Sequence, residues 1–428
     1  MNRAQRAVQT TDGNWKFKEE SSYGWILVGI SFLSMAFWMG IRSSFSVFYA
    51  TLLDEFQWSR ASTAFVQSIT FVMYMVSVPF IGGAIDRFGP RFVILPGIIL
   101  LAIGLMLSST VKSLFEFYLY YGIIVGIGTA CVSIVPYSAI LAHWFEKRRG
   151  LASGIASSGM GFGTFSLLII SEALISTHGW REAFFVLGLL ALILLFPTNG
   201  FLLKHKPENR ASSPRSPKEQ DSAKDSCEKT KLKKVLLSNQ FLMCVAFGSL
   251  VLLSVHVILV HSVRIFMDQG ISLNQASSAL AIVGVVSSLF RVLWGWLSDW
   301  KGRKVSYTMG ASFLILSGVS LFLTQPEREW LIYIFVFSFS AGWGVTAPSF
   351  MAILADLFKG ERFGAIYGFF EAAIYGLSVL GVWAVGLIYD LKGTYWPNTF
   401  IVISGSVIAS ILIIWLIRNP YDGSVKIP

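Results

Sequence analysis

Three arginines, Arg42, Arg264 and Arg291, stand inside long stretches of sequence that otherwise carry almost no charge. A guanidinium stays protonated, and its planar N–H groups can hold a carboxylate by two parallel hydrogen bonds. Burial of this group among apolar residues costs free energy unless it meets a partner or a polar cavity. Arg264 is near the end of its stretch, from which a long side chain can reach water. Arg42 and Arg291 are therefore candidates for binding an anion, with a structural ion pair as the alternative for each.

A few groups in the same kind of stretch could carry a proton. Histidine titrates near physiological pH and is cheap to bury when neutral. His261 could therefore couple a proton to another event, or it could be a packing residue whose ring is satisfied by its neighbours. For Glu371 the alternatives are a proton-coupling function and pairing with an arginine. Glu172 and His256 are weaker candidates of the same kind.

The sequence offers little support for metal binding, ATP binding or catalysis. The three cysteines, Cys131, Cys227 and Cys244, have neither metal-ligand spacing nor a disulfide pattern. The sequence has no Gly-x-x-x-x-Gly-Lys-Ser/Thr motif, which disfavours direct drive by ATP, and no nucleophile–base pair stands out. We therefore expect no enzyme activity, no metal and no cofactor.

Long apolar segments must position the charged residues. The 428 residues are 54% hydrophobic and 14% charged, against about 25% charged in typical soluble chains. A helix of about 18 or more apolar residues can cross roughly 30 Å of hydrocarbon. Twelve such stretches are expected, at residues 24–51, 62–85, 92–110, 114–142, 150–175, 181–203, 239–267, 274–298, 305–323, 330–357, 364–390 and 396–417. The sequence thus predicts an all-α integral membrane protein with twelve transmembrane helices.

The positive charge follows the expected topology. Of the 34 lysines and arginines, 26 fall in the tails and loops on the side of the N-terminus and five in the opposite loops. By the positive-inside bias, we expect the protein to lie in the cell membrane (plasma or inner membrane) with both termini on the cytoplasmic side. Topology therefore explains the net charge of +10 without nucleic-acid binding.

Two separated blocks of sequence recur at one offset. Gly82, Asp86 and Gly89 recur 213 residues later as Gly295, Asp299 and Gly302, and Phe145 recurs as Phe358. A shared offset indicates two parallel halves of six helices each.

The repeat gives the expected domain organisation. We expect a cytoplasmic tail over 1–22, a six-helix bundle over 23–203, a cytoplasmic linker over 204–236, a second six-helix bundle over 237–418 and a cytoplasmic tail over 419–428. A monomer is expected to function.

The loops after the second and eighth stretches read Gly82-Gly-Ala-Ile-Asp86-Arg87-Phe-Gly89-Pro-Arg91 and Gly295-Trp-Leu-Ser-Asp299-Trp-Lys301-Gly302-Arg303-Lys304. Their first glycine lets helices approach, the carboxylate can pair with a cation or a helix N-terminus, and the second glycine permits a tight turn. Such a latch can break when two bundles rock apart. These loops resemble the signature of the major facilitator superfamily, which implies its fold. A solvated loop that only fixes topology is the alternative, and it leaves the repeated spacing unexplained.

The segment entering the fifth stretch reads Trp144-Phe145-Glu146-Lys147-Arg148-Arg149-Gly150-Leu151-Ala152-Ser153-Gly154-Ile155-Ala156-Ser157-Ser158-Gly159. It resembles the helix 5 signature of the monocarboxylate transporter family, with Trp144 in place of Tyr and Ser158 in place of the last Ala. Residues 20–25 match that family's helix 1 pattern in part. Gly154 and Gly159 could instead serve helix packing alone.

The resemblance implies roles for the two arginines. The family carries an arginine four residues before the helix 8 glycine, as Arg291 stands before Gly295, and this implies that Arg291 binds the substrate carboxylate. Arg42 is similar in position to a functionally important helix 1 lysine. A structural ion pair is the alternative for both arginines.

One departure from the family affects proton coupling. Mammalian members commonly have an aspartate at the position of Ser287, so a relay through Arg291 lacks its carboxylate here, and Glu371 or His261 would have to replace it. Tyr137 and Trp343 could line the substrate pocket or pack against lipid and other helices.

We therefore expect a secondary active transporter of small monocarboxylates, such as lactate or pyruvate, that works by alternating access and proton symport. Its expected partners are the substrate, protons and the lipid bilayer. A rival is an organic-anion exchanger of the oxalate and formate type, because two fixed positive charges would suit a dicarboxylate. A membrane sensor that binds carboxylates without moving them is a third possibility, but the short loops and tails offer no signalling domain.

Overall fold

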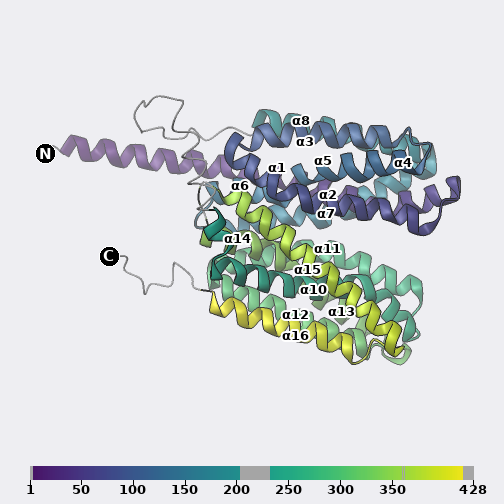
Figure 1. Ribbon diagram of the computed structural model, residues 1–428. Helices are drawn as coiled ribbons and strands as arrows, with labels where there is room; N and C mark the ends of the chain where they lie inside the picture. The colour runs from purple at the N-terminus through teal and green to yellow at the C-terminus, as the bar shows by residue number, and fades with distance from the viewer. Residues whose placement is uncertain (1–2, 203–231, 359, 361, 418–428) are drawn as a thin grey trace.

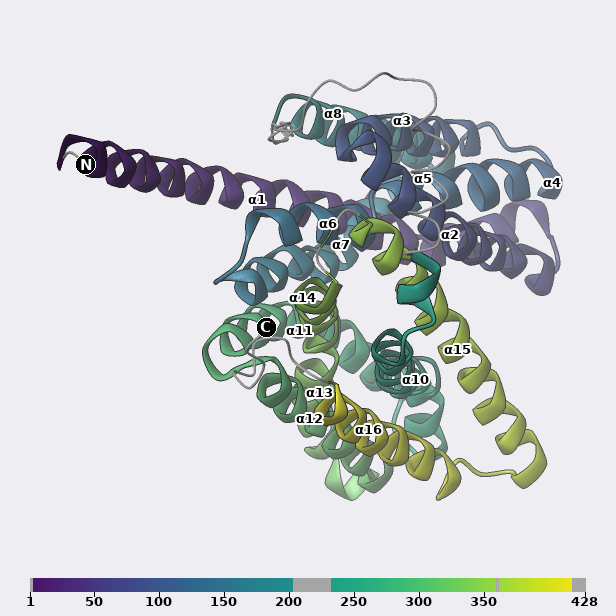
Figure 2. The ribbon, with the colours of Figure 1, turned by 60° about the vertical axis from the view of Figure 1, so that its left-hand side comes forward.

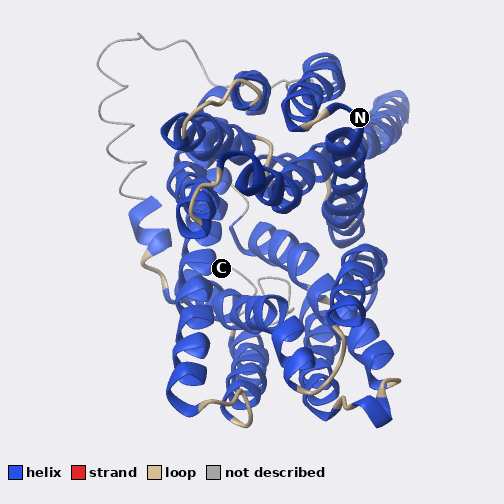
Figure 3. Ribbon diagram, turned by 90° about the vertical axis from the view of Figure 1, so that its right-hand side faces the viewer, coloured by secondary structure: helices blue, strands red, loops and turns tan. Residues whose placement is uncertain are grey.

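A computed structural model of the chain describes residues 3–202, 232–358, 360 and 362–417, which form helices joined by short loops and contain no strand (Figure 3). The helices are α1 (Arg3–Phe56), α2 (Arg60–Phe88), α3 (Pro90–Ser108), α4 (Leu114–Phe117), the π-helix η1 (Tyr118–Val125), α5 (Gly126–Cys131), α6 (Ile134–Trp144), α7 (Arg149–His178), α8 (Trp180–Leu202), α10 (Asn239–Asp268), α11 (Leu273–Lys301), α12 (Arg303–Leu323), the short 3₁₀-helix η2 (Pro326–Arg328), α13 (Leu331–Gly344), α14 (Thr346–Phe358), α15 (Phe363–Lys392) and α16 (Asn398–Leu416). In these residues twelve helical spans are long and apolar enough to cross a membrane, as the sequence predicts.

The twelve spans form two bundles of six, α1–α8 and α10–α16, which lie side by side (Figure 1). In the first bundle α1 packs on α7 and α3 on α8; in the second α10 packs on α15 and α16, and α12 on α13. Large apolar side chains on the outer faces, such as Phe80, Phe201 and Leu412, are exposed. This arrangement suits helices surrounded by lipid, and it confirms the predicted all-α membrane fold with two parallel repeats.

The fourth and tenth spans, each predicted as one continuous helix, are broken in the structure. The fourth divides between α5 and α6, and the tenth between α13 and α14. Pro136 and Pro348 occupy the third position of α6 and α14. Because proline has no N–H and its ring clashes with the carbonyl four residues earlier, each proline favours a new helix start at these points.

The bundles meet chiefly at one end, here called the motif end, where Asp86, Asp299 and the first turns of α7 and α15 lie. Contacts between the bundles are made by α2 with α15, by α7 with α11 and α14, and by α6 with α14 and α15. Since α6 and α14 are the halves of their spans nearest the motif end, the bundles are held together there (Figure 1).

Parts of the predicted domain scheme lie outside the described residues. These parts are residues 203–231, most of the predicted linker, and residues 418–428, which include the predicted C-terminal tail. On the N-terminal side, α1 begins at Arg3 and extends beyond the bundle (Figure 2). The domain boundaries themselves stay predictions.

Candidate substrate site between the bundles

Arg291 is a buried cation without a carboxylate partner among the described residues. Its side chain projects from α11 and is 3% exposed. The guanidinium Nη1 donates to Met160 Sδ across the bundle interface (3.6 Å), and the guanidinium carbon is 5.5 Å from the ring centroid of Trp343. Its Nε has no hydrogen-bond partner. An anion at this position would supply the missing acceptor.

Arg42, in the other bundle, is a second cation among aromatic rings. Its guanidinium carbon lies 4.5 Å from the ring centroid of Phe71 and 5.5 Å from those of Trp38 and Tyr74. Its Nη1 is buried and has no hydrogen-bond partner. Aromatic faces stabilise the charge but accept no strong hydrogen bond, so Arg42 also retains donors that could serve an anion.

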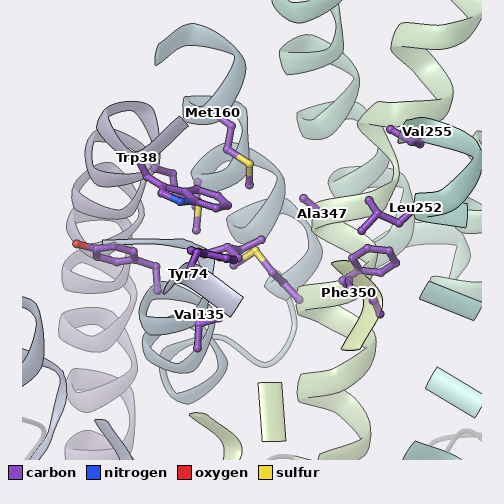
Figure 4. Packing of buried hydrophobic residues seen from close by; sticks show 14 of the residues in the cluster. Trp38, Tyr74, Val135, Met160, Leu252, Val255, Ala347 and Phe350 are labelled. Carbon is purple, nitrogen blue, oxygen red and sulfur yellow. The ribbon is translucent and has the colours of Figure 1, made fainter. Parts of the chain in front are cut away.

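Figure 4 shows buried apolar and aromatic side chains of the two bundles. Trp38, Tyr74 and Met160 lie on one side, and Leu252, Val255, Ala347 and Phe350 lie on the other. The indole of Trp38 stacks on the ring of Tyr74 with centroids 5.7 Å apart. Of these side chains, Trp38 and Tyr74 adjoin Arg42 and Met160 adjoins Arg291, so aromatic and apolar groups border both cations, as is typical of a small-molecule site.

A polar face of α15 completes the cluster. Tyr367, Glu371, Tyr375 and Ser378 follow one another at spacings of four, four and three residues, which places them on one side of the helix. The Tyr375 ring lies 6.0 Å from that of Tyr74 across the interface and 5.5 Å from the His256 ring. His256 Nδ1 is 3.1 Å from Ser378 Oγ.

Electrostatic interactions join this face to both arginines. Glu371 is 3% exposed, and among the described residues it forms neither a hydrogen bond nor an ion pair. Arg42 interacts electrostatically with Glu371 and with Tyr375, and Arg291 also interacts with Tyr375. Two predicted site cations and one predicted carboxylate thus interact electrostatically with the same tyrosine.

Two other predicted residues lie near Arg291. Trp343 provides the aromatic face described above, from α13. Ser287 precedes Arg291 by one helical turn, but its hydroxyl donates to the carbonyl of Gly284 in its own helix (2.9 Å). Ser287 therefore offers no charge and no free donor in this conformation.

Three predicted or considered residues lie away from this cluster. Tyr137 is fully buried within the first bundle, where its hydroxyl donates to Asn199 Oδ1 (2.9 Å). Arg264 is 60% exposed and pairs with Asp268 (3.0 Å), in keeping with a side chain that reaches the boundary between membrane and water. Glu172 is exposed on α7.

His261 is also separate from the arginines. Its Nδ1 and Nε2 lie 3.3 Å from the Tyr395 hydroxyl and from the Val382 carbonyl oxygen. Tyr395 precedes α16, at the end of the molecule opposite the motif end. Burial raises the pKa of Tyr395, so its hydroxyl keeps its proton and can donate to the His261 ring.

Sequence reasoning missed the residues that connect the two arginines. Tyr375 and Tyr74 were hidden among 14 tyrosines, and Met160 among 11 methionines. A signal for Tyr375 was present, because it lies one turn beyond Glu371 on the same helical face. The Tyr74 contact depends on how two helices from different bundles meet, and no local spacing reveals it.

At the motif end, two aspartates cap helices of the opposite bundle. Asp86 of α2 accepts hydrogen bonds from the backbone N–H groups of Gly364 and Ala365 (both 2.8 Å) at the start of α15. Asp299 of α11 accepts from those of Gly150 and Leu151 (2.8 and 2.7 Å) at the start of α7. Each carboxylate thus satisfies two free N–H groups and meets the positive end of the helix dipole.

Ion pairs strengthen the second of these contacts. Arg303 pairs with Asp299 (2.5 Å) and through Nε with Asp356 (2.9 Å). Asp356 also pairs with Arg149 from the other bundle. Sequence reasoning missed Asp356, which has no acidic counterpart in the first half because His143 occupies the equivalent position, 213 residues earlier.

The motif glycines permit the close approach. A side chain at Gly82 would collide with the backbone of Gly364, and one at Gly295 with that of Gly150. Gly89 and Gly302 adopt φ values of 86° and 93°, which residues with a Cβ rarely adopt.

The basic motif residues lie at the surface of this end. Arg87 and Lys304 lie over the rings of Phe88 (5.3 Å) and Trp415 (5.8 Å). The exposed residues of the group are Arg87, Arg91, Lys147 and Arg148.

The remaining signature residues pack helices together. Phe145 lies against Gly24 and edge-on to Trp25 (5.3 Å), so the two resembling segments contact each other. Gly154 faces the backbone of Arg291, and Gly159 that of Phe32. Because Gly154 has no side chain, α7 can pack directly against the backbone of α11 at Arg291.

Comparisons with known proteins agree with this architecture. A family model described as Major Facilitator Superfamily matches residues 26–352. Human "Monocarboxylate transporter 2" is 27% identical over 400 residues, which are 90% of this chain and 81% of that protein. "Monocarboxylate transporter 13" of Rattus norvegicus is 26% identical over 406 residues, 94% of this chain and 89% of that protein.

Solved structures share the fold at low sequence identity. The proton:xylose symporter XylE, bound to 6-bromo-6-deoxy-D-glucose, has a TM-score of 0.69 and 17% identity over 94% of this chain and 97% of its own. A variant of the E. coli fucose:proton symporter FucP has a TM-score of 0.72 and 13% identity over 91% and 98% of the two chains. The chain therefore belongs to the Major Facilitator Superfamily, as a multi-pass membrane transporter whose similar relatives are monocarboxylate transporters.

Proposed function

We propose that this protein is a secondary active transporter of small monocarboxylates and that Arg291 binds the substrate carboxylate. The observation that carries the proposal is a fully buried guanidinium that forms no ion pair with any described residue and has an unpartnered Nε. An unpaired charge in a low-dielectric site is costly, and a transported anion would relieve that cost. The names of the similar relatives favour a monocarboxylate.

The charge of the cluster supports proton symport. With Arg42 and Arg291 protonated and Glu371 ionised, the empty site carries one net positive charge. If one anion and one proton enter together, and the proton neutralises Glu371, the loaded site carries the same charge. The empty and the loaded transporter can then change between their two conformations at similar electrostatic cost. This supports Glu371 as the coupling group.

Alternating access would use the contacts at the motif end as a latch. The caps from Asp86 and Asp299 hold the bundles together at that end, so substrate would enter from the opposite end in this conformation. Release of both caps would let the bundles rock apart and open the motif end. The distribution of lysine and arginine supports placing the motif end at the cytoplasm.

The test is uptake of radiolabelled lactate into proteoliposomes. Symport predicts uphill uptake driven by an imposed pH gradient with no internal anion. Glu371→Gln should abolish this response while keeping exchange of labelled for unlabelled lactate, because exchange needs no net proton movement. His261→Gln is the matched variant and should keep the full pH response. Loss of the pH response in His261→Gln, with its retention in Glu371→Gln, would reverse the assignment.

An anion exchanger of the oxalate and formate type is the second candidate. The observation in its favour is that Arg42 and Arg291 both keep an unpartnered nitrogen and both interact electrostatically with Tyr375. Exchange predicts uptake only when the vesicles contain an anion, whatever the pH gradient. A sensor predicts carboxylate binding without flux under either condition.

A further inference from the structure

Met160 of α7 meets the guanidinium of Arg291 from the opposite bundle. Its sulfur accepts a hydrogen bond from Nη1, with 3.6 Å between the two atoms. The Met160 side chain is 6% exposed, and the Nε of Arg291 has no hydrogen-bond partner. The first bundle therefore engages one end of the guanidinium and leaves another donor free.

The planar shape of the guanidinium decides which donors remain for a ligand. Nη1 lies on the Cδ side of the group, whereas Nε–H and Nη2 form the edge on the other side. A carboxylate can bind such an edge by two parallel hydrogen bonds. Because Met160 engages Nη1 and the Nε donor is unpartnered, the edge formed by Nε and Nη2 is the one that remains for a substrate.

A thioether suits this contact better than a charged acceptor. Methionine sulfur is a weak, neutral acceptor, so it can orient a guanidinium without neutralising its charge. A carboxylate at position 160 would form an ion pair with Arg291 and would compete with the substrate anion. Met160 thus satisfies one donor and leaves the positive charge for the ligand.

Close packing between α7 and α11 fixes the place of the sulfur. Gly154 and Gly161, two helical turns apart on α7, stand before and after Met160. An added Cβ at Gly154 would collide with the backbone of Arg291, and one at Gly161 with the side chain of Ser288. The two helices therefore touch on both sides of Met160, and its side chain is held in register with the guanidinium.

We propose that Met160 is a positioning residue for the substrate: its sulfur holds Nη1 of Arg291 so that the edge formed by Nε and Nη2 faces the bound carboxylate. This inference rests on the proposed function and adds how the cation is oriented. It also makes the binding site depend on both bundles, because Arg291 belongs to the second and Met160 to the first. The net effect of one such hydrogen bond on a dissociation constant is about three- to tenfold.

Two variants of Met160 distinguish positioning from packing. Met160→Leu keeps an apolar side chain of similar size but removes the acceptor, so the dissociation constant of lactate should rise about three- to tenfold. Met160→Gln keeps a neutral acceptor of similar length and should stay within about twofold of wild type. If Met160 only fills space, the order is reversed, because leucine is then tolerated and a buried amide is not. That reversed order would overturn the inference.

The measurement is lactate binding to purified protein, and two comparisons control it. Met106→Leu makes the same chemical change beside Gly188, inside the first bundle, and should match wild type. In Arg291→Lys, adding Met160→Leu should change the dissociation constant by less than about twofold, since an ammonium group has no edge to orient. A packing defect would instead weaken binding equally with arginine or lysine at position 291, and this comparison decides the question if Met160→Gln does not fold.

The outcomes separate this inference from the proposed function. If the wild type does not bind lactate, the proposed function is wrong and the inference falls with it. If lactate binds and Arg291→Lys weakens its binding, but Met160→Leu matches wild type, the positioning role is wrong and the proposed function stands.

Discussion

Replacing Asp299 by asparagine should open the motif end. The carboxylate accepts from the N–H groups of Gly150 and Leu151 and pairs with Arg303. An asparagine carbonyl can accept one of these bonds, while its NH₂ group repels the second N–H and offers nothing to the guanidinium. The loss of one charge-assisted hydrogen bond and a partly buried ion pair should destabilise the closed latch by about 2–3 kcal/mol. The ratio of closed to open molecules should therefore fall by roughly 30- to 150-fold.

The measurement is a distance distribution between spin labels at Lys147 and Trp300, which are exposed on opposite bundles at the motif end. Labels are placed in a background without the native cysteines, in nanodiscs. Wild type should give mainly the short distance, and Asp299→Asn should add a longer one. Asp268→Asn is the control, because Asp268 pairs with Arg264 inside one bundle. An unchanged distribution in Asp299→Asn would refute the latch.

Two further predictions concern the candidate substrate site and the turn at Gly302. Trp343→Ala removes the aromatic face 5.5 Å from the Arg291 guanidinium, so KM for lactate uptake should rise about two- to fivefold, and an unchanged KM would show that this face does not position the cation. Gly302→Ala forces a Cβ into φ 93° and should cost about 1–2 kcal/mol, which would lower the thermal unfolding midpoint in detergent. Gly405→Ala, where an added Cβ meets nothing within 4 Å, is its control, and equal midpoints for the two variants would contradict the strain argument.

The helices and their pairing into halves were accessible from the sequence because their signals are local or periodic. An apolar stretch must be helical in hydrocarbon, and the 213-residue offset between Asp86 and Asp299 reports the repeat directly. The breaks before Pro136 and Pro348 were less accessible, since proline is also tolerated within membrane helices, as Pro79 in α2 shows.

The site was accessible only in part. Arg42, Arg291 and Glu371 were identifiable because a charge within an apolar stretch requires an explanation. Their proximity around Tyr375 depends on how the two bundles meet. The partners of His261 and Tyr137 were equally hidden, because a buried hydroxyl or ring nitrogen can be satisfied inside a bundle as well as in a pocket.

The central claim is that Arg291 binds the substrate carboxylate through its planar fork. The most direct test is the dissociation constant of lactate for purified Arg291→Lys, measured beside Arg264→Lys, which keeps an exposed cation outside the site. Lysine keeps the charge but cannot form two parallel hydrogen bonds, so the dissociation constant should rise at least about tenfold while Arg264→Lys matches wild type. Wild-type affinity in folded Arg291→Lys would contradict the account.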